Sequence, residues 1–424
     1  MSARPRAFVL VTGSELVRGG RRDENGPFLA RQLTRLGLEP ARVVTVGDGA
    51  DELAAALREG LEADLCVISG GLGPTHDDRT IELLAQAADR RLLVDSELER
   101  EIEAVSRRGA ARIGRAYADF SAGVRKQASI PEGGVSLGLA GTAPAVLLEH
   151  DGSVAVALPG PPGELQRLWP AALASDPVQG LLARVERPDQ RILRFFGPSE
   201  SAVARALVEA GGELPGLDVT VCAHDLEIAV DVFVAAGRER EADSLVDALR
   251  NRFGGDLFAL DQRSAAEIVL DLCRVRRLTL ATAESCTGGL VGARLTAVPG
   301  SSDVYVGGVV AYADAVKARQ LRVPEEVLER HGAVSAETAA AMAAGARVEF
   351  GANLAVSVTG IAGPGGATPE KPVGLVFCHA EAPDGELSLR IELPGGREEV
   401  RERATVAALH LVRRLLTQRT DTHA

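Results

Sequence analysis

The sequence predicts an α/β protein made of several domains. Short apolar runs typical of buried strands alternate with helical patterns, which is the rhythm of a parallel sheet covered by helices. The chain has 424 residues, and at roughly 150 residues per domain this length predicts two or three domains. Apolar residues make up 46% of the chain but aromatic residues only 3%, so we expect aliphatic cores and few surfaces on which bases could stack.

The first domain is expected over residues 1–170. Its alternating elements are strands at 7–12, 41–46 and 64–69 and helices at 26–36, 51–61 and 78–88. In such sheets the ligand site lies beyond the carboxyl ends of the strands, where loops 13–25 and 70–78 are expected. A stretch rich in proline and glycine at 158–163 precedes a less regular pattern, so we place the first boundary near residue 170.

Two further units are expected after this boundary. Residues 171–260 are expected to form a small α+β module, with a strand at 228–234 and a helix at 239–252. Residues 261–424 are expected to form a second α/β domain. Its elements are a helix at 264–276, strands at 278–283, 307–312, 354–359 and 373–380, and helices at 336–348 and 397–416.

Charge and cysteine usage exclude several classes of protein. The net charge of −12 repels phosphate backbones, and seven arginines against twelve acidic residues give the segment 191–260 a charge of −5, so no direct nucleic-acid partner is expected. Five scattered cysteines lack the paired spacing of a zinc site or disulfide framework. The first apolar run is too short for a signal peptide or a membrane span. We therefore expect a soluble cytoplasmic protein with no membrane partner.

Lysine is scarce in this chain. Only Lys126, Lys317 and Lys371 occur, although Lys and Arg together number 47. Arginine stays charged in proteins, whereas a desolvated lysine can lose its proton and act as a base. Two of the three lysines follow the seryl segment AESCTGG at 283–289, and this pattern points to an enzyme built on a Ser/Lys pair.

The seryl segment is the candidate catalytic site. Ser285 follows a predicted strand, and Thr287, Gly288 and Gly289 are expected to open a helix whose first amides would form an oxyanion hole or anion cradle. Serine needs an adjacent base, for which Lys317 is the candidate, with Tyr312 relaying or orienting the proton. The alternatives are that Ser285 is a helix N-cap, that Lys317 is a solvated helix residue, and that Cys286 is the nucleophile.

A second glycine-rich loop follows another predicted strand. It reads TGIAGPGG at 359–366, and its candidate substrate-binding residues are Thr359, Gly360, Gly363 and Gly365. Two loops of this kind suit a nucleotide that carries a phosphate at one end and a reacting carbonyl at the other.

Residues 264–416 resemble the carboxyl-terminal domain of the competence/damage-inducible protein CinA family. The matching motifs are AESCTGG, GGVVAYADAVK at 307–317, HGAVS at 331–335, TGIAGPGG and EKPVG at 370–374. The resemblance implies a nicotinamide mononucleotide deamidase, which hydrolyses the carboxamide to nicotinate mononucleotide and ammonia without a cofactor. It implies Ser285 as nucleophile and Lys317 as base, supported by Tyr312 and Thr287, with Lys371 and the two glycine loops holding the substrate. Ala313 and Ala315 replace polar residues that are common in the family.

Residues 1–170 resemble the other half of the same family, a three-layer domain similar to molybdopterin-binding proteins. The match lies in GSEL at 13–16, Asp23, Asn25 and SGGLGPTHDDRT at 69–80. It implies a nucleotide site, in some members an ADP-ribose pyrophosphatase. Asp77 and Asp78 would hold a divalent cation, unless they are a helix-start pair. The expected phosphate contacts are Gly70, Gly71, Gly73, Thr75 and Lys126.

The family's Asn-x-x-Gly-Thr-Ala-Pro-Gly motif loses two residues here, at Gly138 and Ala145. Nucleotide binding without cleavage therefore stays open. The chain as a whole would then be either a two-headed pyridine-nucleotide salvage enzyme or a catalytically idle scaffold that binds a nucleotide or molybdopterin. Domains of this kind commonly pair, so a homodimer is expected.

Overall fold

In a computed structural model, which describes residues 5–185, 187–383 and 385–417, the chain folds into two compact units, residues 1–188 and 189–424. Across the described residues, no helix combines the length and the apolar character that crossing a membrane requires.

The first unit is built on a six-stranded sheet in the order β2-β1-β3-β8-β7-β6. The first four strands in that order run parallel, and β7 and β6 are antiparallel to their neighbours. This mixed sheet has the α/β architecture that the sequence predicts. The strands are β1 (Arg6–Thr12), β2 (Glu39–Val46), β3 (Leu65–Ser69), β6 (Val135–Leu139), β7 (Pro144–His150) and β8 (Ser153–Leu158).

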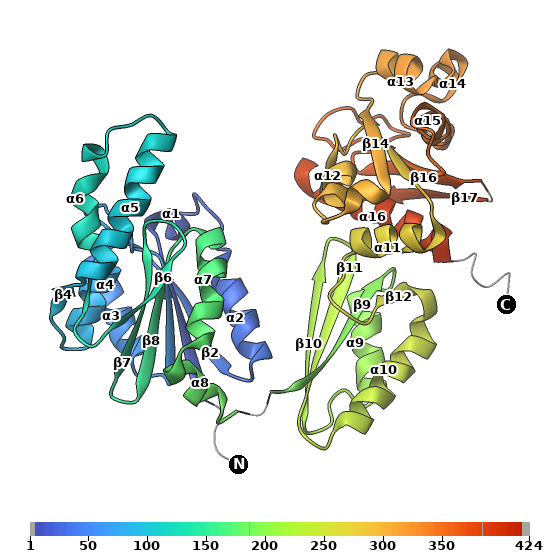
Figure 1. Cartoon of the computed structure of the whole chain (residues 1–424). Helices are drawn as coiled ribbons and strands as arrows, with labels where there is room; N and C mark the ends of the chain where they lie inside the picture. Colours follow the sequence, from blue (N-terminus) through green and yellow to red (C-terminus); the bar gives the residue numbers. More distant parts are fainter. Residues whose placement is uncertain (1–4, 186, 384, 418–424) are drawn as a thin grey trace. The chain divides into compact units, whose positions relative to one another are not determined.

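Helices cover both faces of this sheet (Figure 1). Alternate residues of β1 point to opposite faces, so Phe8 and Leu10 belong to one core while Val9 and Val11 belong to the other. The first core packs against α3 (Ala50–Gly60), α4 (Thr80–Ala87) and α5 (Ser96–Arg112); the second packs against α2 (Asn25–Arg35), α7 (Pro162–Ala174) and α8 (Asp176–Leu182). The smaller elements are α1 (Ser14–Val17), α6 (Ala118–Gln127) and the pair β4 (Leu92–Val94) and β5 (Ser129–Pro131).

The boundary expected near residue 170 is wrong, because that residue lies inside α7. Leu165 and Trp169 of this helix are buried in the second core. Proline is favoured in the first turn of a helix, so the proline-rich stretch starts α7. The first unit therefore extends through α8, to residue 188.

The second unit contains two sheets. A four-stranded antiparallel sheet in the order β10-β11-β9-β12 carries two helices and has a core of its own. Its elements are β9 (Asp189–Phe196), α9 (Glu200–Glu209), β10 (Leu217–His224), β11 (Glu227–Val234), α10 (Glu239–Phe253), the 3-10 turn η1 (Gly254–Asp256) and β12 (Leu257–Ala259).

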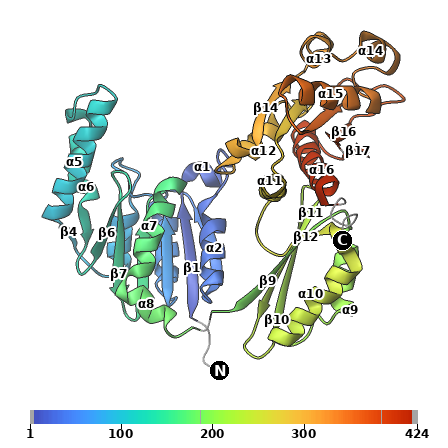
Figure 2. The same cartoon turned by 45° about the vertical axis from the view of Figure 1, so that its right-hand side comes forward.

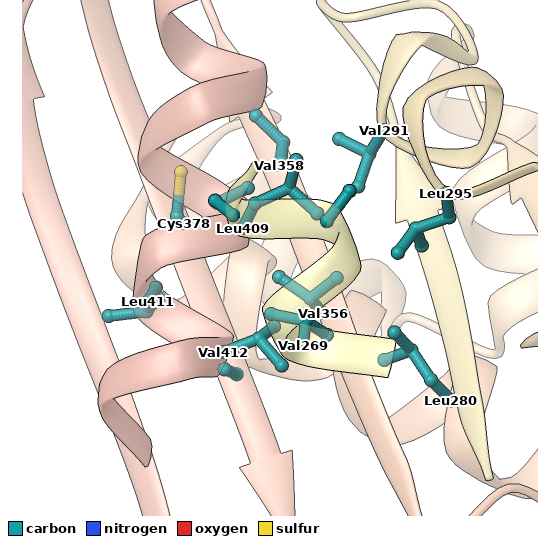
Figure 3. Close-up of a cluster of buried hydrophobic side chains, with 14 of the residues drawn as sticks. Val269, Leu280, Val291, Leu295, Val356, Val358, Cys378, Leu409, Leu411 and Val412 are labelled. Carbon is teal, nitrogen blue, oxygen red and sulfur yellow. The ribbon is translucent and has the colours of Figure 1, made fainter. Parts of the chain in front are cut away.

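The other sheet has five strands in the order β14-β13-β15-β16-β17. Its first three strands run parallel, while β16 and β17 are antiparallel. The strands are β13 (Leu280–Glu284), β14 (Tyr305–Val310), β15 (Leu354–Gly360), β16 (Leu375–Ala382) and β17 (Gly385–Glu392). One face is covered by α11 (Ala265–Arg276), α12 (Leu290–Thr296) and α16 (Arg397–Thr417), whose aliphatic core is drawn in Figure 3. The other elements are η2 (Ser301–Asp303), α13 (Asp314–Leu321), α14 (Glu325–His331) and α15 (Ala336–Glu349).

The long helix α16 joins the two sheets of this unit (Figure 2). His410 is fully buried, stacks on Phe196 with ring centroids 3.9 Å apart and bonds Glu227 of β11 at 2.7 Å. Burial lowers the pKa of this imidazole, which keeps it neutral near pH 7. The opposite end of the same helix reaches the loops of the candidate site.

Candidate functional site

Three loops meet at the carboxyl edge of β14, β13 and β15, the three neighbouring parallel strands. The register aligns the last residue of β13, Glu284, with Val310 and Val358. The backbone amide of Ser285 donates to the Val358 carbonyl at 2.8 Å, and that of Ala311 donates to the Glu284 carbonyl at 2.8 Å. The sheet therefore brings the seryl segment, the stretch that leads to Lys317 and the glycine loop 360–366 to one edge.

Ser285 lies directly after β13 and is 8% exposed. Helix α12 begins at Leu290 with Gly289 as its N-cap residue, so the N-cap reading of Ser285 is wrong. Among the residues that the structure describes, no side chain or backbone group hydrogen-bonds the Ser285 hydroxyl. That oxygen is therefore not engaged in holding the turn together.

The N-terminus of α12 does not form the expected anion cradle, because an internal carboxylate already occupies it. The buried Glu284 side chain accepts from the backbone amides of Gly289 at 2.9 Å, Val291 at 3.1 Å and Gly292 at 2.8 Å, and from the Thr287 hydroxyl at 2.7 Å. A carboxylate is favoured there by the helix dipole and by the unpaired amides of the first turn. The hydrogen bonds of Glu284 therefore hold the seryl turn against the start of α12.

This geometry corrects the expected roles of the three residues after Cys286. Thr287 is fully buried, and its hydroxyl donates a hydrogen bond to Glu284. Gly288 and Gly289 have φ angles of 64° and 100°, which favour glycine. These two glycines therefore allow the backbone to make the turn between β13 and α12. Their amides are not aimed at an external oxyanion in the way that the sequence suggested.

We expect Glu284→Gln to lower the Tm of the transition that reports on the second unit by several degrees. The amide nitrogen of glutamine would face the backbone N–H donors that now bond the carboxylate. Loss of a buried, hydrogen-bonded charge lowers the free energy of unfolding by about 2–4 kcal/mol. Calorimetry of the full chain measures the shift. Glu326→Gln, at an exposed position in the first turn of α14, is the control and should change Tm by less than about 1 °C. Equal shifts in the two variants would contradict the role given to Glu284.

Lys317 is buried, with a side chain that is 1% exposed. Its Nζ donates to the Tyr312 carbonyl at 3.2 Å and to Asp314 Oδ1 at 3.3 Å. Asp314 is itself 60% exposed, so solvent weakens this ion pair. The reading of Lys317 as a solvated helix residue is therefore wrong.

Tyr312 does not relay protons to Lys317 through its phenol. The ring is 58% exposed, and its oxygen accepts a hydrogen bond of 2.7 Å from Arg397 Nη2, while Lys317 contacts only the backbone carbonyl of Tyr312. The phenol and this guanidinium form an exposed hydrogen-bonded pair. The structure therefore shows a surface contact where the sequence predicted a proton relay to Lys317.

Arg397 and Arg401, at the start of α16, were not identified from the sequence. Arg397 Nη1 donates to the Gly363 carbonyl at 2.7 Å, and Arg401 donates from Nε to the Cys286 carbonyl at 3.2 Å and from Nη2 to the Thr287 carbonyl at 2.8 Å. The two arginines join the seryl turn, Tyr312 and the glycine loop. The sequence did contain a signal. The helix dipole disfavours arginine at a helix N-terminus, and Arg397 and Arg401 are spaced four residues apart, which places them on one face of the helix.

Thr359 and Lys371 both make hydrogen bonds within the protein. The buried Thr359 hydroxyl donates to the Ala333 carbonyl at 2.6 Å, and Lys371 Nζ donates to the His331 carbonyl at 2.7 Å. Both tie the glycine loop to the HGAVS segment, residues 331–335. These bonds give both side chains a structural role, and the substrate-binding role expected of Lys371, whose amine has two further N–H donors, stays a prediction.

The three candidate glycines of this loop differ in what surrounds them. A Cβ on Gly360 would lie 3.1 Å from Cys286 Sγ and 2.8 Å from the Leu375 carbonyl, so only glycine fits between the two loops. Gly363 has a φ of 79° and gives its carbonyl to Arg397. Gly365 faces open space, with no atom within 4 Å of a Cβ placed there.

Cys286 belongs to the aliphatic core and is 5% exposed. Burial raises the pKa of its thiol to about 12. At pH 7 this leaves a thiolate fraction on the order of 10⁻⁵, and the thiolate is the nucleophilic form. The structure therefore argues against Cys286 as the rival nucleophile.

The first unit carries a pocket of about 760 Å³ where the loops after β1, β3 and β8 meet. Its wall includes Gly70, Gly71 and Gly73, as the sequence predicts. A Cβ on Gly70 would lie 2.5 Å from the Thr12 carbonyl, and one on Gly71 would lie 2.2 Å from Thr80 Oγ1. The wall is rich in carboxylates, which are Glu15, Asp23, Glu24, Asp48, Asp77, Asp78 and Glu164, and it carries the cations Arg21 and Arg22.

Asp77 and Asp78 lie in one hydrogen-bonded loop with Thr75. The Thr75 hydroxyl donates to both carboxylates, and its amide donates to Asp78 at 2.9 Å. The hydrogen bond from Thr75 lowers the pKa of Asp77. Lys126 Nζ donates to the Thr75 carbonyl and lines a smaller neighbouring pocket of about 180 Å³. Thr75 and Lys126 thus hold this loop, and the phosphate contacts expected of them stay a prediction.

Within the described residues, no three His, Cys, Asp or Glu side chains are grouped so that they could hold a metal ion by themselves. The oxygen-rich lining still matches the donor type that Mg²⁺ prefers, provided that phosphate oxygens complete the coordination.

Comparison with known proteins finds two families on this chain. The family described as CinA C-terminal domain matches residues 262–416, and the family described as probable molybdopterin binding domain matches residues 8–176. Among solved structures, the competence/damage inducible protein CihA from Agrobacterium tumefaciens is 40% identical and covers 37% of this chain and 99% of its own, with a TM-score of 0.35. A structure titled MogA is 20% identical and covers 43% and 99%, with a TM-score of 0.29.

Full-length relatives extend the match across both units. The CinA-like protein of Mycobacterium tuberculosis (strain H37Rv) is 42% identical over 427 aligned residues, covering 98% of this chain and 99% of the relative. The CinA-like protein of Mycolicibacterium vanbaalenii is 42% identical over 424 aligned residues, with the same coverage. The chain therefore belongs to the CinA family.

Proposed function

We propose that the second unit hydrolyses the carboxamide of nicotinamide mononucleotide to nicotinate mononucleotide and ammonia. The observation that carries the proposal is the burial of Lys317 at the same sheet edge as Ser285. Lysine, unlike arginine, can serve as a base, and Lys317 is buried beside a carboxylate that is itself largely exposed. Membership of the CinA family supports the same reading.

The reaction runs through an acyl-enzyme. Ser285 Oγ attacks the carboxamide carbon while its proton passes to Lys317, which acts as the base. The tetrahedral intermediate collapses, and the C–N bond breaks as Lys317 returns the proton to the leaving ammonia. Water then attacks the ester, and its proton passes to Lys317 and on to Ser285 as the acid is released. One water is consumed and one ammonia leaves, and no cofactor takes part.

Arg397 and Tyr312 would bind the nucleotide on the exposed side of the site. A guanidinium binds phosphate in a bidentate manner, and an exposed phenol ring can stack on a pyridine ring. Arg397 already lies between Tyr312 and Gly363. A substrate phosphate at this guanidinium would therefore contact both loops that border the seryl turn.

Ammonia release from nicotinamide mononucleotide by the purified full chain tests the proposal. The expected result is turnover that yields equal amounts of ammonia and nicotinate mononucleotide. A folded chain that releases no ammonia from this or related amides would leave the alternative of a catalytically idle nucleotide- or molybdopterin-binding scaffold. A homodimer remains part of the proposal, to be tested by the molar mass in solution.

For the first unit we propose nucleotide binding, with ADP-ribose pyrophosphatase activity as the candidate reaction. The pocket of about 760 Å³ is large enough for a nucleotide, and its carboxylates would repel a bare pyrophosphate. Asp77 and Asp78 would hold a divalent cation whose charge offsets that repulsion and polarises the phosphate. The hydrogen bond that keeps Asp77 ionised favours this role.

Chelation is expected to separate the two activities. EDTA should abolish ADP-ribose hydrolysis, because the acidic pocket then lacks the charge that neutralises the phosphates, and should leave ammonia release within about twofold. Both reactions are measured on the same preparation, and Mg²⁺ is added back as the control. Loss of ammonia release on chelation would contradict the division of labour between the units.

A further inference from the structure

Arg21 and Arg22 lie in the loop between α1 and α2 and line the pocket of the first unit. Both residues are exposed, which is ordinary for arginine. Their setting is unusual, because every other charged residue in the described wall of this pocket is an aspartate or a glutamate. Seven carboxylates therefore line the pocket, and these two guanidinium groups carry the positive charge of its wall.

Neither guanidinium group is engaged within the protein. Among the residues that the structure describes, no side-chain hydrogen bond or ion pair involves Arg21 or Arg22. Other arginines of the same unit do find partners, since Arg79 and Arg91 each form an ion pair with a glutamate. The two arginines of the pocket thus keep their hydrogen-bond donors for a group from outside the chain.

The backbone of the loop that carries these arginines is held in place. At the start of the loop, the Ser14 amide donates to Asp48 at 2.9 Å. The Arg21 amide donates to the Glu15 carbonyl at 3.1 Å. Beyond the arginines, the Asp23 carboxylate accepts hydrogen bonds of 2.9 and 3.0 Å from the first two backbone amides of α2. The fixed backbone therefore keeps both guanidinium groups at the pocket.

A phosphorylated ligand meets two opposite charges in this pocket. Carboxylates repel phosphate oxygens, and the repulsion is strongest at short range. A guanidinium group binds phosphate through paired, charge-assisted hydrogen bonds, and it stays charged at any pH that the protein meets. Phosphate groups are therefore more stable at Arg21 and Arg22 than at the acidic part of the wall, unless a cation covers the carboxylates.

We infer that Arg21 and Arg22 bind the phosphate groups of the ligand in this pocket and thereby select phosphorylated ligands. The inference rests on the nucleotide-binding function proposed for the first unit and adds the residues that recognise the phosphates. The loop that carries Asp77 and Asp78 follows β3, the parallel neighbour of β1, and lines the same pocket. One diphosphate would then contact the guanidinium groups and a cation held by these carboxylates.

The test measures the Kd of ADP-ribose for the full chain by calorimetry, with Ca²⁺ present at a saturating concentration. The double variant Arg21→Gln/Arg22→Gln removes both guanidinium groups and keeps polar side chains at both positions. Binding should weaken about 10- to 100-fold, because charge-assisted hydrogen bonds to the phosphates are lost. Each single variant should weaken binding by a smaller factor.

The matched control is Arg18→Gln/Arg31→Gln, which removes the same charge from exposed positions of the same unit that do not line the pocket. Its Kd should stay within about twofold of the wild-type value, because solvent and salt screen distant charges. Raising NaCl from about 50 mM to about 500 mM should weaken ADP-ribose binding by similar factors in the wild-type and control chains. The factor should be clearly smaller in Arg21→Gln/Arg22→Gln, which a mere folding defect would not produce.

The outcomes separate the inference from the function on which it rests. If the folded Arg21→Gln/Arg22→Gln chain binds ADP-ribose as tightly as the wild-type chain, the inference is overturned and nucleotide binding stands. Equal weakening in the control variant also overturns it, because the overall charge of the unit would then account for the loss. A folded wild-type chain that binds no ADP-ribose overturns the nucleotide function and the inference together.

Discussion

Replacing Ser285 with alanine is expected to reduce ammonia release from nicotinamide mononucleotide by at least about 1,000-fold, because an acyl-enzyme cannot form without its nucleophile. Cys286→Ala should keep activity within about threefold. The thiol is buried, and its pKa of about 12 leaves almost no thiolate at neutral pH. Initial rates of ammonia release at saturating substrate measure both variants.

The pH dependence of the rate gives an independent check on the nucleophile. A thiol is neutral below its pKa, so a rate that depended on the Cys286 thiolate would rise about tenfold per pH unit up to about pH 12. A serine mechanism does not use the thiol, so the pH profile of Cys286→Ala should match that of the wild-type chain. Inactive Cys286→Ala together with active Ser285→Ala would refute the assignment, provided that both variants show the wild-type Tm within a few degrees.

Sequence patterns predicted the elements that depend on local signals. Strands of a parallel sheet are buried on both faces, so β1 and β3 appear as nearly continuous apolar runs. The strands β13 and β15 appear as mainly apolar runs that a few Ser, Thr or Glu residues interrupt. The edge of the second sheet could be predicted for the same reason, because the seryl and glycine loops follow two of these runs. The hairpin strand β17 was missed, since its alternating polar residues leave no apolar run.

The contacts that define the site could not be predicted in this way. The hydrogen bonds from Arg401 to the seryl turn and from Arg397 to Tyr312 join residues 115 and 85 positions apart. Only the packing of α16 against the sheet brings them together. Glu284 is a different case, because its partners lie within eight positions. Two glycines after a serine are compatible with an open anion site and with a tight turn. No sequence signal shows that the carboxylate of the preceding Glu284 accepts the hydrogen bonds of the helix amides.

Lys317 is expected to matter for activity and not for stability, and Lys317→Met tests both at once. Methionine fills a similar volume without a charge, so ammonia release should fall by at least about 1,000-fold. The Tm should stay the same or rise by a few degrees, because a buried charge with one weak partner is replaced by an apolar group. The partner left behind, Asp314, is 60% exposed and stays hydrated. The measurements are initial rates and calorimetry of the full chain.

Lys317→Arg separates the charge of this side chain from its basicity. Arginine keeps a cation for Asp314 and the Tyr312 carbonyl but does not release its proton, so this variant should also be inactive. A structural Lys317 would give the opposite pattern, in which methionine lowers the Tm by several degrees and arginine restores both stability and turnover. Wild-type-like turnover in the arginine variant would remove Lys317 as the base. Loss of activity in both variants at an undiminished Tm is the pattern that a general base requires, because the side chain is then needed for the reaction and not for folding.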